Sequence, residues 1–515
     1  MATGSTLIES LSQTANPTIL VCTLLCSLAL LLFWIRSAGR SRLPPSPWRL
    51  PIIGNLHQLT DLPHKGLYAL SQKYGPIMLM RFGSVPFCVI SSGELAREVT
   101  KTHDAVFSDR AATKASRMLF PGGDDLLFAP ENKFWRLTKK LCVSELLNVR
   151  RVQSFQTIRV EEVARMVETI RSSNRCEIDL SNLFLQLSSA VFSRVVLGVT
   201  GKNDVKGSLS VQGIQAISEI SSFEDFVPAL SWVDRLTGLH TRLQKTSQSI
   251  HAFLDQIIEH RAEILRSGNG GDEAQRSDEK CFVDIILELK QKDMIDLNLT
   301  HSDIRSILVD MFIAGLGAYA MIMEWAMTLL AKNPKMMKRV QDEVRGIVGR
   351  KSEIHKQDTD RMEYMKCVIK ETLRLHAPAL TVRQASRAVT VGGFELPAKV
   401  TALINIYAIH RDPKAWVRPL EFLPERFMNT SYNFKGQDEV YFPFGMGRRI
   451  CPGIDLAVAE LDYALANVLC WFDWELPEGV APDDIDMRGT SSVTSRKLLP
   501  LRLVPVAIPT PPPST

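Results

Sequence analysis

The chain has 515 residues, of which 45% are hydrophobic and 23% are charged, and its formal net charge is +5. This is the composition of a globular protein with ample material for a large core, and the mild charge without a dense basic run excludes nucleic acid as the partner. The 9 cysteines are scattered without a CxxC pair or a zinc-ligand spacing, which favours reduced, mostly buried thiols on a protein that faces the cytosol.

A long apolar run lies close to the N-terminus. Residues 19–35 are almost wholly apolar, and their length is near the lower limit of about 17–25 residues for a helix that spans a membrane. Arg36, Arg40 and Arg42 follow the run, which places the downstream chain on the cytoplasmic side. In the alternative, a cleaved signal peptide, basic residues would precede the run. We therefore expect an uncleaved transmembrane anchor in residues 1–36.

The segments that follow divide the rest of the chain. Prolines are dense between residues 43 and 51, where they resist helix and sheet and make a stiff spacer. We assign residues 37–55 to a basic, proline-rich hinge and residues 56–508 to one globular body. The proline-rich residues 509–515 are expected to form a disordered tail.

The body is predicted to be mainly α with minor β. Helix-period apolar spacing predicts helices over residues 160–171, 247–265, 303–331 and 334–348. Ser302, or Thr300 before it, can cap the third of these helices. Short runs typical of β-strands occur at residues 77–82, 86–90, 389–394, 401–406 and 499–506.

Two charged motifs favour a buried cluster. Glu371 and Arg374 lie three residues apart on a predicted helix and so share one face. Alone this pattern is weak, because such pairs are common on solvated helices. Arg426, in the Pro-Glu-Arg-Phe run at residues 424–427, can join them, since buried charges are tolerable when they pair with one another.

The most informative motif surrounds Cys451, in the run Phe-Gly-Met-Gly-Arg-Arg-Ile-Cys-Pro-Gly from Phe444 to Gly453. Glycines let backbone N–H groups approach a sulfur, and a thiolate that ligates haem iron needs such hydrogen bonds. Arg449 can face a haem propionate as a charge-assisted partner. The alternative is a buried free cysteine in a glycine-rich turn.

Other residues can reach the same propionates. Trp135 and Lys139 lie on one helix, with an aromatic ring and cations close together. Arg383 is a further candidate. Taken with the hinge, the Lys-Glu-Thr-Leu-Arg run at residues 370–374 and the motifs above, these features resemble the cytochrome P450 family, in its plant A-type, membrane-anchored branch.

The resemblance covers the chain from the anchor to the last predicted strand. It implies a helical prism around haem b with a minor β region, in a haem-thiolate catalytic domain at residues 56–508. Cys451 would be the axial ligand of the iron, with Phe444 and Gly453 beside it. Electrons would come from NADPH through a diflavin reductase. The protein would be a single-pass protein of the endoplasmic reticulum membrane, with a cytosolic catalytic body and a lipophilic small-molecule substrate.

The chain departs from this family on its predicted long helix. Family members usually carry Ala-Gly-x-Asp/Glu-Thr above the distal haem face, where the acid and the alcohol deliver protons during oxygen activation. Here Ala314 and Gly315 are followed by Gly317 at the place of the acid and Ala318 at the place of the threonine. A positioned proton donor typically contributes about 10²–10⁴-fold, so its loss bears on the reaction. We treat these residues and Tyr319 as the candidate catalytic group.

Two further features of this helix have alternative interpretations. Gly315 and Gly317 each cost about 1 kcal/mol relative to alanine, which indicates a bend or a close approach of the backbone, or else tolerated sequence drift. Tyr319 can offer a phenol near the site or pack against a neighbouring helix. Elsewhere, Lys139 stands where the family usually has arginine, and the segment before Arg383 is short by about two residues.

Three functions remain in view. The first is a haem-thiolate, reductase-dependent oxidase of a lipophilic plant specialised metabolite, which favours oxidative cyclisation, rearrangement or coupling, with conventional hydroxylation by substrate-assisted proton delivery close behind. The second is a redox-independent haem isomerase or dehydratase. The third is a non-catalytic haem-binding protein. The substrate pocket is expected to involve residues 118–127, 223–232, 314–320, 379–382 and 491–493.

Overall fold

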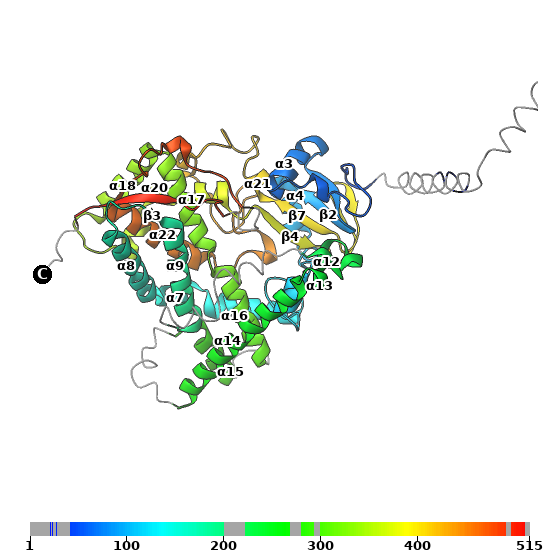
Figure 1. Ribbon diagram of the computed structural model, residues 1–515, viewed down its shortest axis with the longest axis horizontal. Helices are drawn as coiled ribbons and strands as arrows, with labels where there is room; N and C mark the ends of the chain where they lie inside the picture. The colour runs from blue at the N-terminus through cyan, green and yellow to red at the C-terminus, as the bar shows by residue number, and fades with distance from the viewer. Residues whose placement is uncertain are drawn as a thin grey trace, which may run out of the picture.

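The computed structural model describes residues 42–199, 222–267, 280–292, 299–490 and 496–509, together with Val21, Thr23 and Ser27. The rest of the predicted anchor, the first residues of the hinge and residues 510–515 of the predicted tail lie outside the described residues. Figure 1 shows a helical body on one side and a smaller β-rich region on the other.

The helices of the described chain are mostly long and amphipathic. The α-helices are α3 (Pro63–Tyr74), α4 (Gly93–Arg97), α5 (Lys114–Leu119), α6 (Lys133–Leu141), α7 (Val149–Ser154), α8 (Gln156–Ser172), α9 (Leu180–Phe192), α12 (Phe223–Phe226), α13 (Val233–Leu236), α14 (Leu239–Ser267), α15 (Phe282–Gln291), α16 (His301–Gly315), α17 (Ala318–Lys332), α18 (Pro334–Val348), α19 (Lys356–Arg361), α20 (Glu363–His376), α21 (Ile406–Ile409) and α22 (Ile454–Trp471). Short 3-10 or π segments are η1 (Leu56–Gln58), η2 (Glu98–Thr102), η3 (Cys142–Leu146), η4 (Ser193–Leu197), η5 (Pro228–Leu230), η6 (Pro424–Phe427), η7 (Gly447–Arg449) and η8 (Pro482–Asp484).

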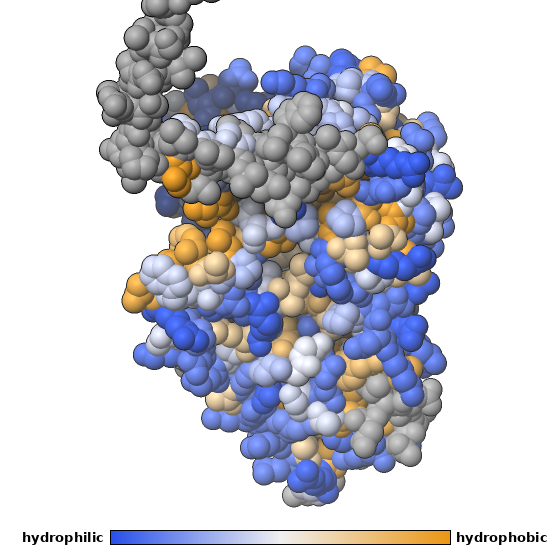
Figure 2. Space-filling model, turned by 90° about the vertical axis from the view of Figure 1, so that its right-hand side faces the viewer, coloured by the Kyte–Doolittle hydropathy of each residue, from blue (hydrophilic) through white to orange (hydrophobic). Residues whose placement is uncertain are grey.

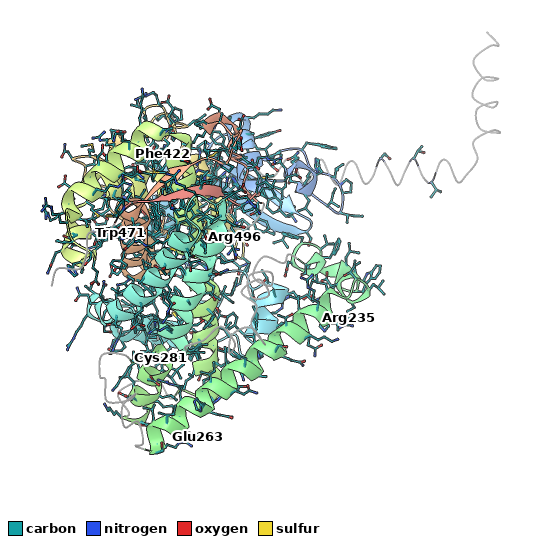
Figure 3. The ribbon with its side chains drawn as sticks, turned by 60° about the vertical axis from the view of Figure 1, so that its left-hand side comes forward. Arg235, Glu263, Cys281, Phe422, Trp471 and Arg496 are labelled. Carbon is teal, nitrogen blue, oxygen red and sulfur yellow. The ribbon has the colours of Figure 1, made fainter. Side chains whose placement is uncertain are left out.

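The core is built around α17, which packs against α9, α20 and α22. It is buried on nearly all sides, and Trp325 near its middle is 1% exposed. A helix that is apolar all round belongs in the interior of a large protein. Figure 3 shows that α13 and α14 instead run along the edge of the molecule, from Arg235 to Glu263.

Three small sheets accompany the helices. The largest has the order β1 (Ile77–Phe82), β2 (Val85–Ile90), β7 (Thr401–Asn405) and β4 (Leu380–Gln384), in which only the β2–β7 pair is parallel. A second sheet orders β3 (Ile178–Asp179), β9 (Arg502–Ala507) and β8 (Phe472–Glu475), and a hairpin joins β5 (Val389–Val391) to β6 (Phe394–Leu396). The mainly α fold with minor β is therefore confirmed.

Some element predictions need correction. The strand expected at residues 389–394 is the hairpin of β5 and β6, because Gly392 and Gly393 adopt φ of +56° and +80° and turn the chain. The helix expected at residues 303–331 is two helices, α16 and α17. Strands β3, β4 and β8 were not predicted, since each is short.

Two segments of the chain are hydrogen-bonded to residues at the turn between β1 and β2. In the hinge, the Asn55 N–H donates to the Arg81 carbonyl at 2.6 Å. From the other side, the Ser84 N–H donates to the Phe226 carbonyl of α12 at 2.9 Å. The described part of the hinge and the α12–α13 segment therefore border the same turn.

Among the described residues, two stretches are long and apolar enough to cross a membrane, Leu180–Leu197 and His301–Lys332. They are 56% and 78% buried within the structure, and both run through the helical core. Their apolar character is explained by that burial.

Candidate active site

The loop that carries Cys451 is closed by a backbone hydrogen bond. The Cys451 N–H donates to the carbonyl of Phe444 at 3.0 Å, so the two ends of this motif lie side by side. Gly445 and Gly447 have φ of +81° and +70°, a region that favours glycine. A Cβ on Gly447 would lie 2.0 Å from the Thr100 carbonyl oxygen. The turn therefore requires this glycine, and it leads directly into α22.

Cys451 is a free cysteine with an electropositive environment. Burial raises the pKa of its thiol, whereas a hydrogen bond from the Gly453 N–H and the charges of Lys139 and Arg110 lower it. The backbone N–H and the two cations stabilise the thiolate form. This is the environment that a thiolate ligand of a metal needs.

Arg449 is fixed by the backbone around it. Its guanidinium is buried and donates to the carbonyls of Ser108 and Leu126 at 2.7 and 2.9 Å. It also lies 4.1 Å from the centre of the Trp135 ring. Burial, and next the charge of Arg110, lower the pKa of Arg449 to about 10.

Trp135 and Lys139 meet Arg449 from α6. The Trp135 indole N–H donates to the Leu126 carbonyl at 3.1 Å, and the Lys139 ammonium lies 5.3 Å from the centre of the same indole. Lys139 donates to the Arg448 carbonyl. Burial and the charge of Arg449 lower its pKa. The residues predicted from α6 and from the cysteine loop are thus brought together.

Arg383 reaches the same cluster from β4. It is buried and donates to the Val382 carbonyl at 2.9 Å and to the Thr381 hydroxyl at 3.3 Å. Burial, then the charges of Arg110 and Arg449, lower its pKa well below the ordinary value. The short segment before Arg383 has therefore not removed it from the site.

Arg110 is a member of the cluster that the sequence analysis missed. It donates to the Leu127 carbonyl at 2.8 Å, and its buried Nε has no hydrogen-bond partner. Burial lowers its pKa, while Asp125, Asp310 and Cys451 raise it. Arg110 lies far from Cys451 in sequence and belongs to none of the motifs, so only the fold reveals it.

Within the described residues, none of these four cations forms an ion pair with a carboxylate. Buried charges of one sign without counter-ions are costly. A ligand with carboxylates would relieve that cost, and the two propionates of haem are such groups. Together with the thiol of Cys451 and the orphaned Nε of Arg110, the residues present fit a haem with a cysteine ligand.

The distal helix is interrupted beside this site. The chain leaves helical geometry at Leu316, and Gly317 adopts φ of +84° before α17 begins. The Gly317 N–H donates to the Ser188 hydroxyl of α9 at 3.1 Å in place of a helical carbonyl. A Cβ on Gly315 would lie 1.7 Å from Cε1 of Phe192. The bend expected here is present, and the close approach at Gly315 is to the Phe192 ring rather than to a ligand.

The residues around the break between α16 and α17 lie on two different faces of the helix. Ala314 and Ala318 are exposed although they lie in the middle of the molecule, whereas Gly317 and Tyr319 are buried. One turn before Ala314, Asp310 accepts a hydrogen bond from the Leu126 N–H at 2.6 Å. The face with both alanines therefore continues toward the residues that surround Arg449.

Tyr319 points to the opposite side. Its ring stacks on Phe192 of α9, with centroids 6.2 Å apart. Burial raises the pKa of its phenol well above the ordinary value, and the next cause is the charge of Glu460 on α22. Packing against a neighbouring helix is therefore what these contacts show, and they do not bring Tyr319 to the cation cluster.

The predicted charge cluster lies at the end of α20. Arg374 donates twice to the Glu371 carboxylate, at 2.7 and 2.8 Å, and Arg426 donates to it at 3.0 Å. Glu371 and Arg374 have fully buried side chains. Arg374 also donates to the His410 carbonyl at 2.7 Å. The cluster ties α20 to the segments that precede the cysteine loop.

The chain is similar to known proteins over most of its length. The family model for cytochrome P450 matches residues 44–501. The chain is 40% identical to the phenylacetaldehyde oxime monooxygenase CYP71AN24 of Prunus mume, over 96% of each protein. It is 41% identical to the strychnine-11-hydroxylase of Strychnos nux-vomica, over 90% of this chain and 91% of that protein. It is 39% identical to the psoralen synthase of Pastinaca sativa, over 90% of this chain and 96% of that protein.

The fold agrees with solved structures. A zebrafish cytochrome P450 solved with progesterone superposes with a TM-score of 0.73 at 22% identity, over 87% of this chain and 99% of that chain. The chain therefore belongs to the cytochrome P450 family, in its plant A-type branch, and is a haem-thiolate monooxygenase-type oxidoreductase of plant specialised metabolism that draws electrons from a redox partner.

Proposed function

We propose that Cys451 ligates the iron of haem b and that Arg110, Lys139, Arg383 and Arg449 hold the propionates. The observation that carries this assignment is a set of cations around one free cysteine that form no ion pair within the described residues. When bound, the haem supplies the one-electron and oxygen chemistry of the family. In our proposal the electrons come from NADPH through a diflavin reductase.

In this proposal, the chain's own residues tune and position the cofactor. The Gly453 N–H donates to the Cys451 sulfur and so moderates the donor strength of the thiolate. Trp135 contacts both Arg449 and Lys139, whose charged groups lie 4.1 and 5.3 Å from the centre of its ring. The cofactor is therefore fixed in orientation before any substrate enters.

We propose that the reaction departs from ordinary oxygen insertion. Ala314 and Ala318 present only methyl groups on the exposed face of the distal helix, and Gly317 has no side chain. Asp310 is the nearby carboxyl of this helix, and burial raises its pKa well above the ordinary value. Its carboxyl is engaged by the Leu126 N–H, one turn away from Ala314.

The supply of protons on this face is therefore left to the substrate or to water. Oxidative cyclisation, rearrangement or coupling suffers least from that loss, because removal of hydrogen atoms then replaces insertion of oxygen. Conventional hydroxylation remains the alternative, with the substrate's own hydroxyl or amine as the relay. The names of the relatives, which refer to an oxime, strychnine and psoralen, support a lipophilic plant metabolite as the substrate.

Reconstitution with a reductase and NADPH against a plant metabolite extract tests this proposal. A product lighter by two hydrogens supports cyclisation or coupling, and a product heavier by one oxygen supports hydroxylation. The double variant Gly317→Asp with Ala318→Thr restores the acid and the alcohol. Unchanged products and unchanged hydrogen peroxide release in that variant would contradict the proton argument.

A redox-independent isomerase or dehydratase is the second candidate, favoured by the same loss of the acid and the alcohol. A hydroperoxide supplied without reductase and NADPH discriminates between the two. Turnover under those conditions would replace the first proposal with the second.

We also propose that the body rests on the membrane of the endoplasmic reticulum beside a single-pass anchor. Trp48 and Ile52 of the hinge are 69% and 73% exposed, and Trp232 and Leu236 near α13 are 55% and 77% exposed. Both segments border the β1–β2 turn. Figure 2 views the molecule from this side and shows apolar side chains gathered on part of the face. Exposed apolar groups on one face are typical of a membrane contact.

Fluorescence of the full chain tests the membrane contact. Brominated lipids should quench the emission of Trp232, and the variant Trp232→Phe should lose that part of the quenching. Equal quenching in both proteins would exclude this face as the contact.

A further inference from the structure

A cavity of about 100 Å³ lies outside the haem cluster, between the start of α3, the end of α20, α21 and residues 487–490. Among the described residues, its lining includes two unpaired cations and three imidazoles but no carboxylate: Lys65, Arg411, His64, His376 and His410. Arg374 also borders it, but it is already ion-paired with Glu371. A polar cavity that is lined by cations and not by carboxylates favours the binding of an anion.

Arg411 is the central cation of this cavity. Its side chain is buried, with 7% of its surface exposed, and it donates to the Tyr407 carbonyl at 3.4 Å and to the Leu375 carbonyl. Within the described residues it forms no ion pair with a carboxylate. A guanidinium has five N–H groups, so donors remain for the cavity that Arg411 lines.

Two imidazoles add N–H donors to those of Arg411 in the cavity. His376 stacks on Trp325 at 3.7 Å between ring centroids, and His64 lies 4.9 Å from the Tyr407 ring. Burial lowers the pKa of both, to about 4 for His64, and nearby cations are the next cause for each. Both rings are thus neutral at pH 7, each has one N–H to donate, and the charge of the cavity comes from Lys65 and Arg411.

We propose that this Arg411 cavity is a binding site for a small oxyanion. Its volume equals that of about three water molecules, which is room for a phosphate or a carboxylate group. Arginine with further N–H donors is the arrangement that recognises such groups. The oxyanion has two possible sources, free phosphate or the carboxylate of a substrate.

The second source depends on the position of the cavity along α17. Trp325, in its lining, lies seven residues after Ala318, which is roughly 10 Å along a helix axis. A substrate that reaches from the exposed alanine face to the cavity would place its carboxylate there. This second source rests on the proposed function, whereas binding of free phosphate does not.

Calorimetry on the full-chain holoenzyme tests the site, with sodium phosphate and sodium benzoate as probes and sodium chloride at equal ionic strength as the reference. We expect saturable one-to-one binding of at least one probe. Lys65→Gln should weaken it about fivefold, and Arg411→Gln should abolish it. Lys73→Gln, two turns further along α3 and outside the cavity, is the matched control and should bind like the parent.

The spectrum of the haem separates the two sources. Phosphate binding without a Soret shift identifies a free oxyanion, and benzoate binding with a Soret shift that Lys65→Gln weakens identifies a substrate carboxylate. Arg411 supports the Leu375 carbonyl, so Arg411→Gln can fail to fold, but Lys65 is exposed and keeps the test decisive. No binding of either probe shows that the cavity holds water only, and equal binding in Lys65→Gln shows that the probe binds elsewhere; either result overturns the proposal. A normal carbon-monoxide spectrum alongside that result would leave the haem assignment intact.

Discussion

The two sides of the candidate haem site differ in how many of the expected residues the chain retains. On the side of Cys451, the glycines of the loop, the cations near the cysteine and the cluster of Glu371 and Arg374 are all present. On the distal side, the helix is interrupted, and Gly317 and Ala318 stand where an acid and an alcohol would be expected.

This difference separates two tasks. In the proposed site, holding the cofactor depends on buried charged groups, and loss of Glu371 would leave Arg374 uncompensated. Controlling protons on the distal face depends on a few side chains whose loss leaves no buried charge behind. The distal face is therefore free to change with the reaction, while the cysteine side is not.

The strongest challenge to the cysteine side is Cys451→Ser. We expect loss of the carbon-monoxide spectrum that is typical of thiolate ligation, and loss of turnover, because the alcohol is a far weaker donor to iron. Absorbance of the reduced carbon-monoxide complex and product formation check this. Cys470→Ser, at a buried cysteine of α22, is the control and should keep the spectrum. A Cys451→Ser protein with the parental spectrum and turnover would refute the assignment.

The next largest effect is expected at the charge cluster. Glu371→Gln leaves Arg374 buried without its counter-ion, which we expect to cost about 3–5 kcal/mol of unfolding free energy. Denaturant unfolding and the yield of haem-loaded protein measure this loss. Glu421→Gln, which breaks the exposed pair with Arg418, should cost less than about 1 kcal/mol. Equal losses in the two variants would contradict a special role for the cluster.

Two glycine substitutions sharpen the account of the distal helix. Gly315→Ala places a methyl group against the Phe192 ring, and we expect a loss of about 1–3 kcal/mol. Gly346→Ala, in the helix α18 with open space around it, should instead stabilise the protein by about 0.5–1 kcal/mol. Thermal unfolding of both variants is the measurement. Partial recovery in Gly315→Ala with Phe192→Leu would locate the clash, and a gain in Gly315→Ala alone would disprove the close approach.

The smallest expected effect is a pH dependence of the unfolding free energy, and it comes from a histidine that supports the segment before the cysteine loop. Burial lowers the pKa of His410 to about 3, and its Nε2 accepts from the Phe442 N–H at 3.2 Å. An unfolded histidine titrates near 6.5, so this contribution is complete above pH 6.5 and declines as the pH falls toward 3. We expect this contribution to the unfolding free energy to be smaller by about 1.4 kcal/mol at one pH unit below 6.5.

Denaturant unfolding between pH 7 and pH 5 measures this slope. His410→Gln keeps a neutral polar side chain and should remove that part of the pH dependence. An unchanged slope in the variant would show that His410 is not the group that titrates.

Much of the cysteine side could be predicted because its residues occur in short runs. The loop from Phe444 to Gly453 and the pair Glu371 and Arg374 each carry their spacing in the sequence. Arg110 could not be found in this way, since it enters the cluster through the fold and not through a motif. The contacts of Tyr319 were equally hidden, because a residue on a fully buried helix can face any of several neighbours.

The sequence by itself determined the family, the identity of the cysteine and the loss of the acid and the alcohol, because these depend on which residues follow one another along the chain. Only the tertiary structure decided where α16 ends and α17 begins, that Arg383 reaches the cluster, and that a cavity forms around Arg411. These features arise from packing between segments far apart in sequence, and the spacing of residues along the chain does not predict such contacts.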